Sequence, residues 1–198
     1  MNARKDPGIT LQMTSGRMLN LLAIEAGDIS ITDIAHALSM TCRFNGHTRT
    51  FHSVAHHSLL VASLCAPEFA LEALLHDASE AYTGDLPTPI KHRAEMAGFR
   101  AIEDHITSVI RRKFGLPQAE SPEVKAADRM ALAWERRDLM QPHPSVPRTP
   151  GLPVFVIQTM TPAAAEHEFL AAFRILASRR SQTTHSTATW RTTWEAGC

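Results

Sequence analysis

Residues 73 to 91 read ALLHDASEAYTGDLPTPIK, and this stretch contains the most informative group of side chains in the chain. On an α-helix successive residues advance by about 100°, so His76 and Asp77 lie about 100° apart around the axis, and Glu80 falls at about 40°, between them. We therefore predict a helix here that presents an imidazole and two carboxylates on one wide face. Such a face suits a metal ion held by His76 and Asp77, with Glu80 beside its water.

A His-Asp pair alone is more commonly a coincidence on a protein surface, so a metal site needs ligands from elsewhere in the chain. His57 lies on the apolar stripe of a helix expected over residues 53–65, which turns its ring inward. Asp128 interrupts an apolar face of a helix expected over residues 122–139, with Ser121 as its N-cap. One stripe of this second helix carries Val124, Asp128, Ala131 and Glu135. Buried carboxylates are rare unless they are paired or bound to metal.

Either residue alone is more commonly a hydrogen-bonded core group. Together with the His-Asp pair, however, His57 and Asp128 complete a set of two imidazoles and two carboxylates. This set suits a hydrolytic divalent ion such as Mn²⁺, Co²⁺, Fe²⁺ or Zn²⁺, with positions left for water and a phosphate oxygen.

The remaining periodicity predicts an all-α domain with a small hairpin at its start. The hairpin is expected within residues 8–22, around Ser15-Gly16. Further helices are expected over residues 33–39 with Thr32 as N-cap, from Pro67 through the His-Asp pair, over 93–114, and over 162–178 with Phe169, Phe173 and Leu176 buried. Irregular segments are expected at 41–51, 84–89 and 142–153, and one short strand at 154–158. We expect one domain over residues 1–180 and a disordered tail over 181–198.

The composition argues against several classes of partner. Charged residues make up 20% of the 198 residues and the formal net charge is zero, so we expect no nucleic-acid polymer, which requires a basic surface. The three cysteines are too few and too scattered for a disulfide framework or a zinc ribbon. No apolar run approaches the about 18 residues of a membrane span, and no signal peptide is visible, so we expect a cytoplasmic protein without membrane partners.

The order of the candidate ligands resembles the HD superfamily of metal-dependent phosphohydrolases, which are helical bundles. The motifs SVAHHS (53–58), ALLHDASEAYTGDLPTPIK (73–91) and VKAADR (124–129) are similar to those of bacterial 5′-deoxynucleotidases, and equally to those of phage enzymes that hydrolyse dATP to deoxyadenosine and inorganic phosphates. RFNGHTR (43–49) is similar to the nucleotide-binding loop of the same group. The resemblance covers roughly residues 30 to 140.

The resemblance implies roles for the metal and its water. His57, His76, Asp77 and Asp128 would hold one catalytic divalent transition metal (Co, Mn, Zn or Fe), and Glu80 would orient or deprotonate the attacking water. His56 stands where relatives often carry an acid or amide, and it is not assigned as a ligand. His47 and His52 either help to bind phosphate or have no role. Ordinary helix or core histidines are expected at His36, His105 and His167.

The resemblance also implies contacts with the substrate. Arg43 would contact the phosphate or the base edge. Phe44, at a position where several relatives carry Trp, would pack against sugar or base. Asp85 would lie near the ribose and disfavour a 2′-hydroxyl, although it can also be read as a turn residue. Thr88 and Lys91 would touch phosphate, and the alternative for Lys91 is a solvated charge.

We therefore predict an HD-type enzyme that cleaves a phosphate ester or anhydride at the 5′ position of a small 2′-deoxynucleotide. Two versions stay open, which are removal of phosphate from monophosphates and removal of triphosphate from dNTPs, and the spacing around RFNGHTR favours the second. An HD enzyme for a signalling nucleotide is an alternative that the GDLPTP segment opposes. A non-catalytic, metal-dependent nucleotide sensor is another, which Glu80 opposes. We expect a homo-oligomer in the cytoplasm of a bacterial cell. The gene that encodes it could also belong to a phage.

Overall fold

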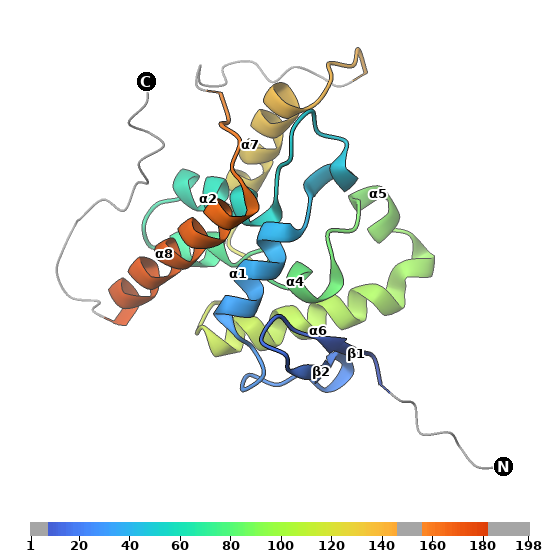
Figure 1. Ribbon diagram of the computed structural model, residues 1–198, viewed down its shortest axis with the longest axis vertical. Helices are drawn as coiled ribbons and strands as arrows, with labels where there is room; N and C mark the ends of the chain where they lie inside the picture. Colours follow the sequence, from blue (N-terminus) through green and yellow to red (C-terminus); the bar gives the residue numbers. More distant parts are fainter. Residues whose placement is uncertain (1–7, 146–155, 182–198) are drawn as a thin grey trace.

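The computed structural model describes residues 8–145 and 156–181, and within these ranges it is a helical bundle with one small hairpin (Figure 1). The α-helices are α1 (Ile31–Met40), α2 (Val54–Leu64), α3 (Ala70–Leu74), α4 (Glu80–Thr83), α5 (Thr88–Lys91), α6 (Ala97–Lys113), α7 (Pro122–Leu139) and α8 (Pro162–Ser181). The strands are β1 (Thr10–Gln12) and β2 (Met18–Asn20), and the 3-10 helices are η1 (Leu21–Ala23), η2 (Arg43–Gly46) and η3 (Ala94–Met96). The predicted all-α fold is confirmed. None of the described helices is long and apolar enough to span a membrane.

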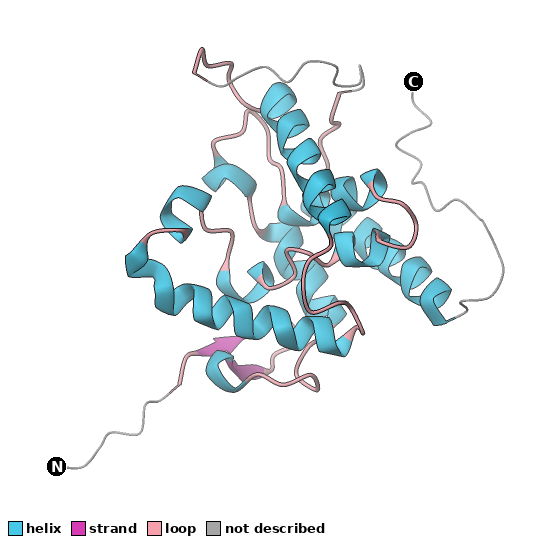
Figure 2. Cartoon of the chain, turned by 180° about the vertical axis from the view of Figure 1, so that it is seen from behind, coloured by secondary structure: helices cyan, strands magenta, loops and turns pink. Residues whose placement is uncertain are grey.

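Helix α2 lies at the centre of the bundle. It packs against α1, α3, α7 and α8. Its buried residues lie on every side of the helix and are Val54, Ala55, His57, Ser58, Leu59, Leu60, Val61 and Ala62. A helix that is apolar all round is a buried one, so an imidazole on α2 is held inside the core. The long helix α6 runs along one side of the bundle, with the hairpin beyond it (Figure 2).

The predicted hairpin is confirmed. Its strands pair antiparallel in the register Thr10↔Asn20, Leu11↔Leu19 and Gln12↔Met18. The turn closes with Gly16 N donating to Met13 O at 2.9 Å and Met13 N donating to Arg17 O at 2.8 Å. Gly16 has φ 81, a conformation that costs glycine little because it has no Cβ atom.

Asp33 fastens this hairpin to α1. The carboxylate is 4% exposed and accepts two hydrogen bonds of 2.9 Å, from the backbone N and the Oγ of Ser15. The N-cap of α1 is Ser30, whose Oγ accepts from Asp33 N at 3.3 Å. The prediction of Thr32 as N-cap was therefore wrong. Thr32 lies in the first turn, where its Oγ1 is 2.7 Å from the Oγ of Ser30, and α1 begins two residues earlier than expected.

We expect Asp33→Ala to lower the free energy of unfolding by about 1–3 kcal/mol, because both donors of Ser15 lose a buried acceptor. Ser15→Ala is the matched control, since it removes only the hydroxyl donor and leaves the backbone bond, at a cost of about 0.5–1.5 kcal/mol. Urea denaturation of the two variants measures the difference. If Asp33→Ala has the same free energy of unfolding as the wild type, the hairpin turn does not depend on this carboxylate.

A buried ion pair holds α3, α6 and α7 together. Glu72 accepts hydrogen bonds from Arg111 Nη1 at 3.1 Å, Ser121 N at 2.9 Å and Ser121 Oγ at 2.6 Å. The predicted helix from Pro122 to Leu139 is confirmed, but the hydroxyl of Ser121 binds Glu72 and makes no capping bond. The first turn of α7 is therefore fixed against α3, the helix that leads into the His-Asp pair.

Other predicted segments differ from the structure in detail. Residues 156–158, the described part of the predicted strand, do not form a β-strand. Ile157 N donates instead to the side chain of Asp138, to Oδ2 at 3.0 Å. The helix predicted from residue 93 starts as η3, and α6 follows from Ala97. Helix α8 continues to Ser181, with Phe173 only partly buried. Residues 146–153 of the predicted connection and 182–198 of the predicted tail lie outside the described residues, so the domain limits stay a prediction.

Candidate metal centre

The His-Asp pair lies in a tight turn between α3 and α4. The backbone bonds here join residues three apart, with Ala78 N donating to Leu75 O at 3.1 Å and Glu80 N donating to Asp77 O at 3.0 Å. The prediction of a continuous α-helix was therefore wrong, because the five-residue α3 tightens into 3-10-like turns after Leu74. With about three residues per turn, side chains three apart eclipse each other, which places Glu80 over Asp77.

Three segments bring imidazoles and a carboxylate together. His57 comes from α2, His76 from the turn and Asp128 from α7, and one ligand atom of each lies within 4.8 Å of the others. The Nε2 atom of His57 is 3.2 Å from Asp128 Oδ1, and that of His76 is 4.0 Å from the same oxygen. These three side chains therefore point at one common volume.

Asp77 faces the same volume. Its Oδ2 lies 3.2 Å from His76 Nε2 and 3.6 Å from His57 Nε2. Asp77 thus lies beside both imidazoles, whereas the group whose ligand atoms all lie within 4.8 Å of one another consists of His57, His76 and Asp128. The imidazole rings of His57 and His76 stand 5.2 Å apart, centroid to centroid, at an angle of 53°.

The hydrogen bonds of the two imidazoles leave both Nε2 atoms free for a metal. His76 Nδ1 lies 2.7 Å from the carbonyl oxygen of Ala73, and His57 Nδ1 lies 2.6 Å from a carboxylate oxygen of Glu135. Both partners only accept, so each Nδ1 is the donor in its hydrogen bond, and Nε2 is the ring nitrogen left to bind a metal. Neither buried Nε2 makes a well-aligned hydrogen bond to a described residue, although each lies 3.2 Å from a carboxylate oxygen, that of Asp128 for His57 and that of Asp77 for His76. Two such nitrogens beside two carboxylates fit a divalent transition metal.

The charges of the cluster favour a cation. Burial lowers the pKa of His76, but Asp77 and Asp128 more than offset this effect and raise it to about 9. Burial raises the pKa of Asp77, yet the neighbouring His76, His57 and Arg43 hold it well below its usual range. Both shifts express the same field, in which closely spaced carboxylates stabilise positive charge at the imidazoles. The same negative potential would stabilise a bound metal cation.

Glu80 is the buried acid beside this cluster. It is 7% exposed, and its Oε2 has no hydrogen-bond partner among the described side chains. Burial, reinforced by the charges of Asp77 and Asp85, raises its pKa well above the usual range. A carboxylate in this condition is suited to take up a proton.

Glu135 is the residue that sequence reasoning missed. It lies on α7, is 0% exposed, and contacts His57, His52 and Arg43. Burial raises its pKa, but the charges of His57 and Arg43 lower it well below the usual range. Its signal in the sequence was its place on the stripe of Asp128, seven residues later, where a second carboxylate interrupts apolar residues.

The RFNGHTR segment forms a loop that closes on itself next to the centre. Arg43 N donates to His52 O at 2.9 Å, and Cys42 and Ser53 form an isolated bridge at the base of the loop. Phe44 and Asn45 have positive φ values of 53° and 51°, which strain residues with a Cβ atom. The loop also reaches the C-terminal end of α7, as Figure 1 shows, where Arg49 N donates to Leu139 O at 2.8 Å.

Arg43 is drawn into the centre by acidic partners. Its side chain is 11% exposed, with Nη2 3.1 Å from Glu135 Oε2 and Nη1 3.6 Å from Asp77 Oδ2. Its guanidinium also lies 5.5 Å from the ring centroid of Phe44, which is partly exposed. Of the two histidines left open by the sequence, His52 is buried in this network, whereas His47 is exposed.

The remaining predicted substrate residues follow α4. Asp85 is partly buried just after Gly84, and burial raises its pKa. Thr88 is exposed at the start of α5, and Lys91 Nζ lies 2.7 Å from Glu103 Oε1 on α6. Burial lowers the pKa of Lys91, but its hydrogen bond to Glu103 and the negative charges of Glu103, Glu80 and Asp77 together more than offset this effect and raise the pKa. Lys91 therefore lies near the centre. It is ion-paired with Glu103 and is not the solvated charge of the alternative prediction.

Comparison with known proteins agrees with this geometry. A family model described as 5′-deoxynucleotidase YfbR-like matches residues 63–132. The uncharacterized protein YfdR of Escherichia coli K12 is 43% identical over 156 residues, which cover 78% of this chain and 86% of the relative. The chain belongs to the YfbR-like family. An uncharacterized protein of Rhodobacter capsulatus is 41% identical to this YfbR-like chain over 129 residues, which cover 61% of this chain and 65% of the relative.

The family match covers only part of the candidate centre of this YfbR-like protein. It includes the His-Asp turn, Glu80 and Asp128, all of which lie within residues 63–132. His57 and the Arg43 loop precede the matched region. Their place in the centre therefore follows from the packing of α2 and not from the family match.

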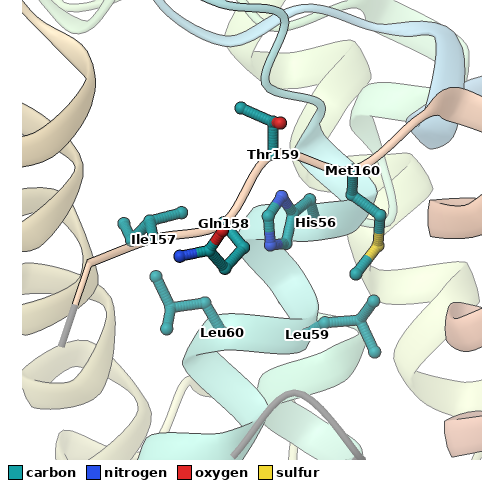
Figure 3. Close-up of a pocket in the computed structure, with 7 residues that line it drawn as sticks. All are labelled: His56, Leu59, Leu60, Ile157, Gln158, Thr159 and Met160. Atoms are coloured by element: carbon teal, nitrogen blue, oxygen red, sulfur yellow. The ribbon is translucent and has the colours of Figure 1, made fainter. Parts of the chain in front are cut away.

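The ring of His56 in this YfbR-like protein lines a small cavity. Figure 3 shows its ring at a cavity of about 40 Å³, which is lined by His56, Leu59, Leu60, Ile157, Gln158, Thr159 and Met160. Burial, together with the charge of His52, lowers the pKa of His56 to about 3, so the ring is neutral. His56 therefore belongs to this cavity, as expected for a histidine that is not a metal ligand. His36 Nδ1 lies 3.0 Å from Glu166 Oε2, while His105 and His167 are exposed.

Proposed function

We propose that this YfbR-like protein is a metal-dependent phosphohydrolase that removes the 5′ phosphate from 2′-deoxynucleoside monophosphates. The observation that carries the proposal is the convergence of two buried Nε2 atoms on the carboxylates of Asp77 and Asp128. The unpartnered Oε2 of the buried Glu80 adds a proton acceptor three residues after Asp77. Such a combination serves hydrolysis better than it serves a purely structural metal, because a structural site does not need an acid beside it.

His57, His76, Asp77 and Asp128 would hold the ion. A divalent metal bound there would polarise the phosphate and lower the pKa of the attacking water. Glu80 would take a proton from this water as its oxygen bonds to phosphorus. The bond from phosphorus to the 5′ oxygen breaks, and the proton held by Glu80 is available to the departing oxygen, leaving a deoxynucleoside and inorganic phosphate.

The substrate would lie between the Arg43 loop and the segment after α4. We propose that Thr88 and Lys91 contact the phosphate and that Phe44 packs against the sugar or base. Arg43 is paired with Glu135 and Asp77, so we propose that Nη1, the more distantly held nitrogen, turns to the substrate. The family name refers to 5′-deoxynucleotidases, which favours monophosphates over the triphosphates that the loop spacing alone favoured.

A substrate panel tests this proposal. Matched dNMPs, dNTPs, NMPs and NTPs are incubated with Co²⁺, Mn²⁺ or Zn²⁺, and nucleoside, phosphate and triphosphate are measured separately. We expect nucleoside and phosphate from dNMPs. Release of triphosphate from dNTPs alone would establish the triphosphohydrolase instead. Tight binding of metal and nucleotide without turnover would establish a sensor, and turnover restricted to a signalling nucleotide would refute the deoxynucleotide proposal.

We expect Asp85→Ala to narrow the preference for deoxyribose over ribose by about 10-fold or more. The reason is that a 2′-hydroxyl would meet a partly buried carboxylate that has no room for it. The measurement is the ratio of kcat/KM for matched dNMP and NMP pairs. Thr88→Ala is the control, because loss of a phosphate contact lowers both rates by the same factor. An unchanged ratio in Asp85→Ala would remove Asp85 from the sugar site.

A further inference from the structure

Glu135 accepts hydrogen bonds from two different parts of the centre at once. Its Oε1 lies 2.9 Å from His52 Nε2 and 2.6 Å from His57 Nδ1. Its Oε2 lies 3.2 Å from Arg43 Nε and 3.1 Å from Arg43 Nη2. The carboxylate is 0% exposed, so it is shielded from bulk water. Each oxygen thus serves one group of donors, the imidazoles on one side and the guanidinium on the other.

The bond to His57 determines which ring nitrogen can bind a metal. Because Oε1 can only accept, Nδ1 of His57 is the donor in this hydrogen bond, and Nε2, which faces Asp77 and Asp128, is the nitrogen left to bind a metal. A carboxylate behind a metal-bound histidine also fixes the plane of the ring. His52 occupies the remaining acceptor position of Oε1 and restricts how this oxygen can rotate.

The bond to Arg43 fixes the loop that we assign to the nucleotide. Two guanidinium nitrogens lie at hydrogen-bonding distance from Oε2, while Nη1 reaches to 3.6 Å from Asp77 Oδ2. Arg43 begins a loop whose next residues have strained, positive φ values, so the loop needs a fixed first residue. The side chain that orients His57 is therefore also the side chain that fixes this loop.

We infer that Glu135 is a positioning residue that couples the metal centre to the nucleotide loop: one carboxylate holds His57 with Nε2 free for the metal and holds Arg43 beside Asp77. This inference rests on the proposed function, because the metal and nucleotide sites are proposals. Glu135 itself touches neither the substrate nor the metal in this assignment. It acts through His57 and Arg43.

Glu135→Gln is the sharpest test, because glutamine keeps the shape but has only one acceptor oxygen. If the amide oxygen faces the imidazoles, its NH₂ group faces the donors of Arg43, and the loop is released. If the amide is turned the other way, its NH₂ group faces His57 Nδ1, which must then accept, and the proton moves to Nε2. Either orientation sets two donors against each other on one side, and their repulsion displaces the amide, so the other side loses its fixed partner as well.

The experiment measures two quantities on the whole protein without using catalysis. Co²⁺ affinity is obtained from the visible absorption of the bound ion, and hydrogen exchange of residues 43–52 is measured in the metal-free protein. Glu72→Gln is the matched control, since it makes the same change in a buried, arginine-paired carboxylate outside the centre. We expect Glu135→Gln to weaken Co²⁺ binding by about 10–100-fold, to alter the Co²⁺ spectrum, and to speed exchange in the loop. Glu72→Gln should lower Tm and leave both quantities as in the wild type.

Several results would overturn the inference. Wild-type Co²⁺ affinity in Glu135→Gln would do so, as would an equal loss in Glu72→Gln, which would show a general effect of stability. Weaker Co²⁺ binding with unchanged loop exchange would refute the coupling. If Glu135→Gln is not recovered folded, Glu135→Asp keeps the charge but is one methylene shorter, and we expect the same two changes relative to Glu72→Asp. Unchanged values in Glu135→Asp would also refute the inference.

The proposed function fails in a different way. A wild-type protein that binds Co²⁺ in a Glu135-dependent manner but hydrolyses no nucleotide would support the positioning role and refute the phosphohydrolase. If the wild-type protein hydrolyses dNMPs but Glu135→Gln has normal Co²⁺ affinity and normal loop exchange, the phosphohydrolase is supported and the positioning role of Glu135 is refuted.

Discussion

Asp77→Ala is expected to abolish both metal binding and phosphohydrolase activity while leaving the helix content nearly intact. Asp77 Oδ2 lies within 3.6 Å of the Nε2 atoms of both imidazoles, so its removal takes away one of the two carboxylates of the cluster. Loss of an outer-shell partner of a metal site already costs about 10–100-fold in affinity, and loss of a direct ligand should cost more. The backbone turn does not depend on this side chain, because the Asp77 carbonyl still accepts from Glu80 N.

Metal analysis of the purified variant, together with circular dichroism, measures this result. Asp104→Ala is the matched control, because it removes an exposed carboxylate from α6 and should leave metal content and turnover unchanged. Full metal occupancy in Asp77→Ala would remove Asp77 from the ligand set. A large loss of helix would show instead that the side chain has a structural role in the turn.

Glu80→Gln is expected to keep the metal and bind nucleotide with near-normal affinity, yet lose about 10²–10⁴-fold in turnover. Glutamine preserves the shape of the side chain but cannot take up a proton. Glu80 has the properties that a proton acceptor needs, because it is buried, its Oε2 has no hydrogen-bond partner among the described residues, and burial with neighbouring acids raises its pKa. The ligand set of two imidazoles and two carboxylates is complete without it.

The measurements are kcat, the Kd of the nucleotide and the metal content. A lower kcat with an unchanged Kd would show that the carboxylate acts in the transition state and not in substrate binding. Loss of the metal would instead make Glu80 a ligand. Normal turnover would mean that another group activates the water. Glu80→Asp is a useful companion, because it keeps the basicity but shortens the reach, and we expect its turnover to lie between those of wild type and Glu80→Gln.

Local chemistry explains why much of the fold could be predicted from the sequence. Helix α2 begins after Ser53, whose Oγ accepts from His56 N at 3.2 Å, and α7 begins at Pro122, where the missing N–H costs nothing. Caps and apolar periodicity involve residues within one or two turns of each other, so they are visible in any short stretch of sequence. The same local logic located Thr32 wrongly, because Ser30 and Thr32 are both good capping residues and only the packed chain distinguishes them.

The turn that carries His76 and Asp77 shows where local reasoning was insufficient. An ideal helix places Glu80 between the two ligands, whereas the 3-10-like turn places it over Asp77. The hydrogen bond from His76 Nδ1 to Ala73 O, at 2.7 Å, closes this turn and orients the ring at the same time. The predicted ligand side chains lie close together, but their relative directions depend on the tight turn that follows α3.

The sequence by itself determined which chemical groups are available: the His-Asp pair, an inward imidazole on α2, and carboxylates on the apolar stripe of α7. Only the tertiary structure decided which atoms meet. Glu135 is 78 residues from His57 and 92 from Arg43 in the chain, yet its two oxygens bind both. Hydrogen bonds act over about 3 Å, whereas sequence patterns report only which face of a helix a side chain occupies. Which oxygen faces which nitrogen is therefore set by the packing of α2 against α7.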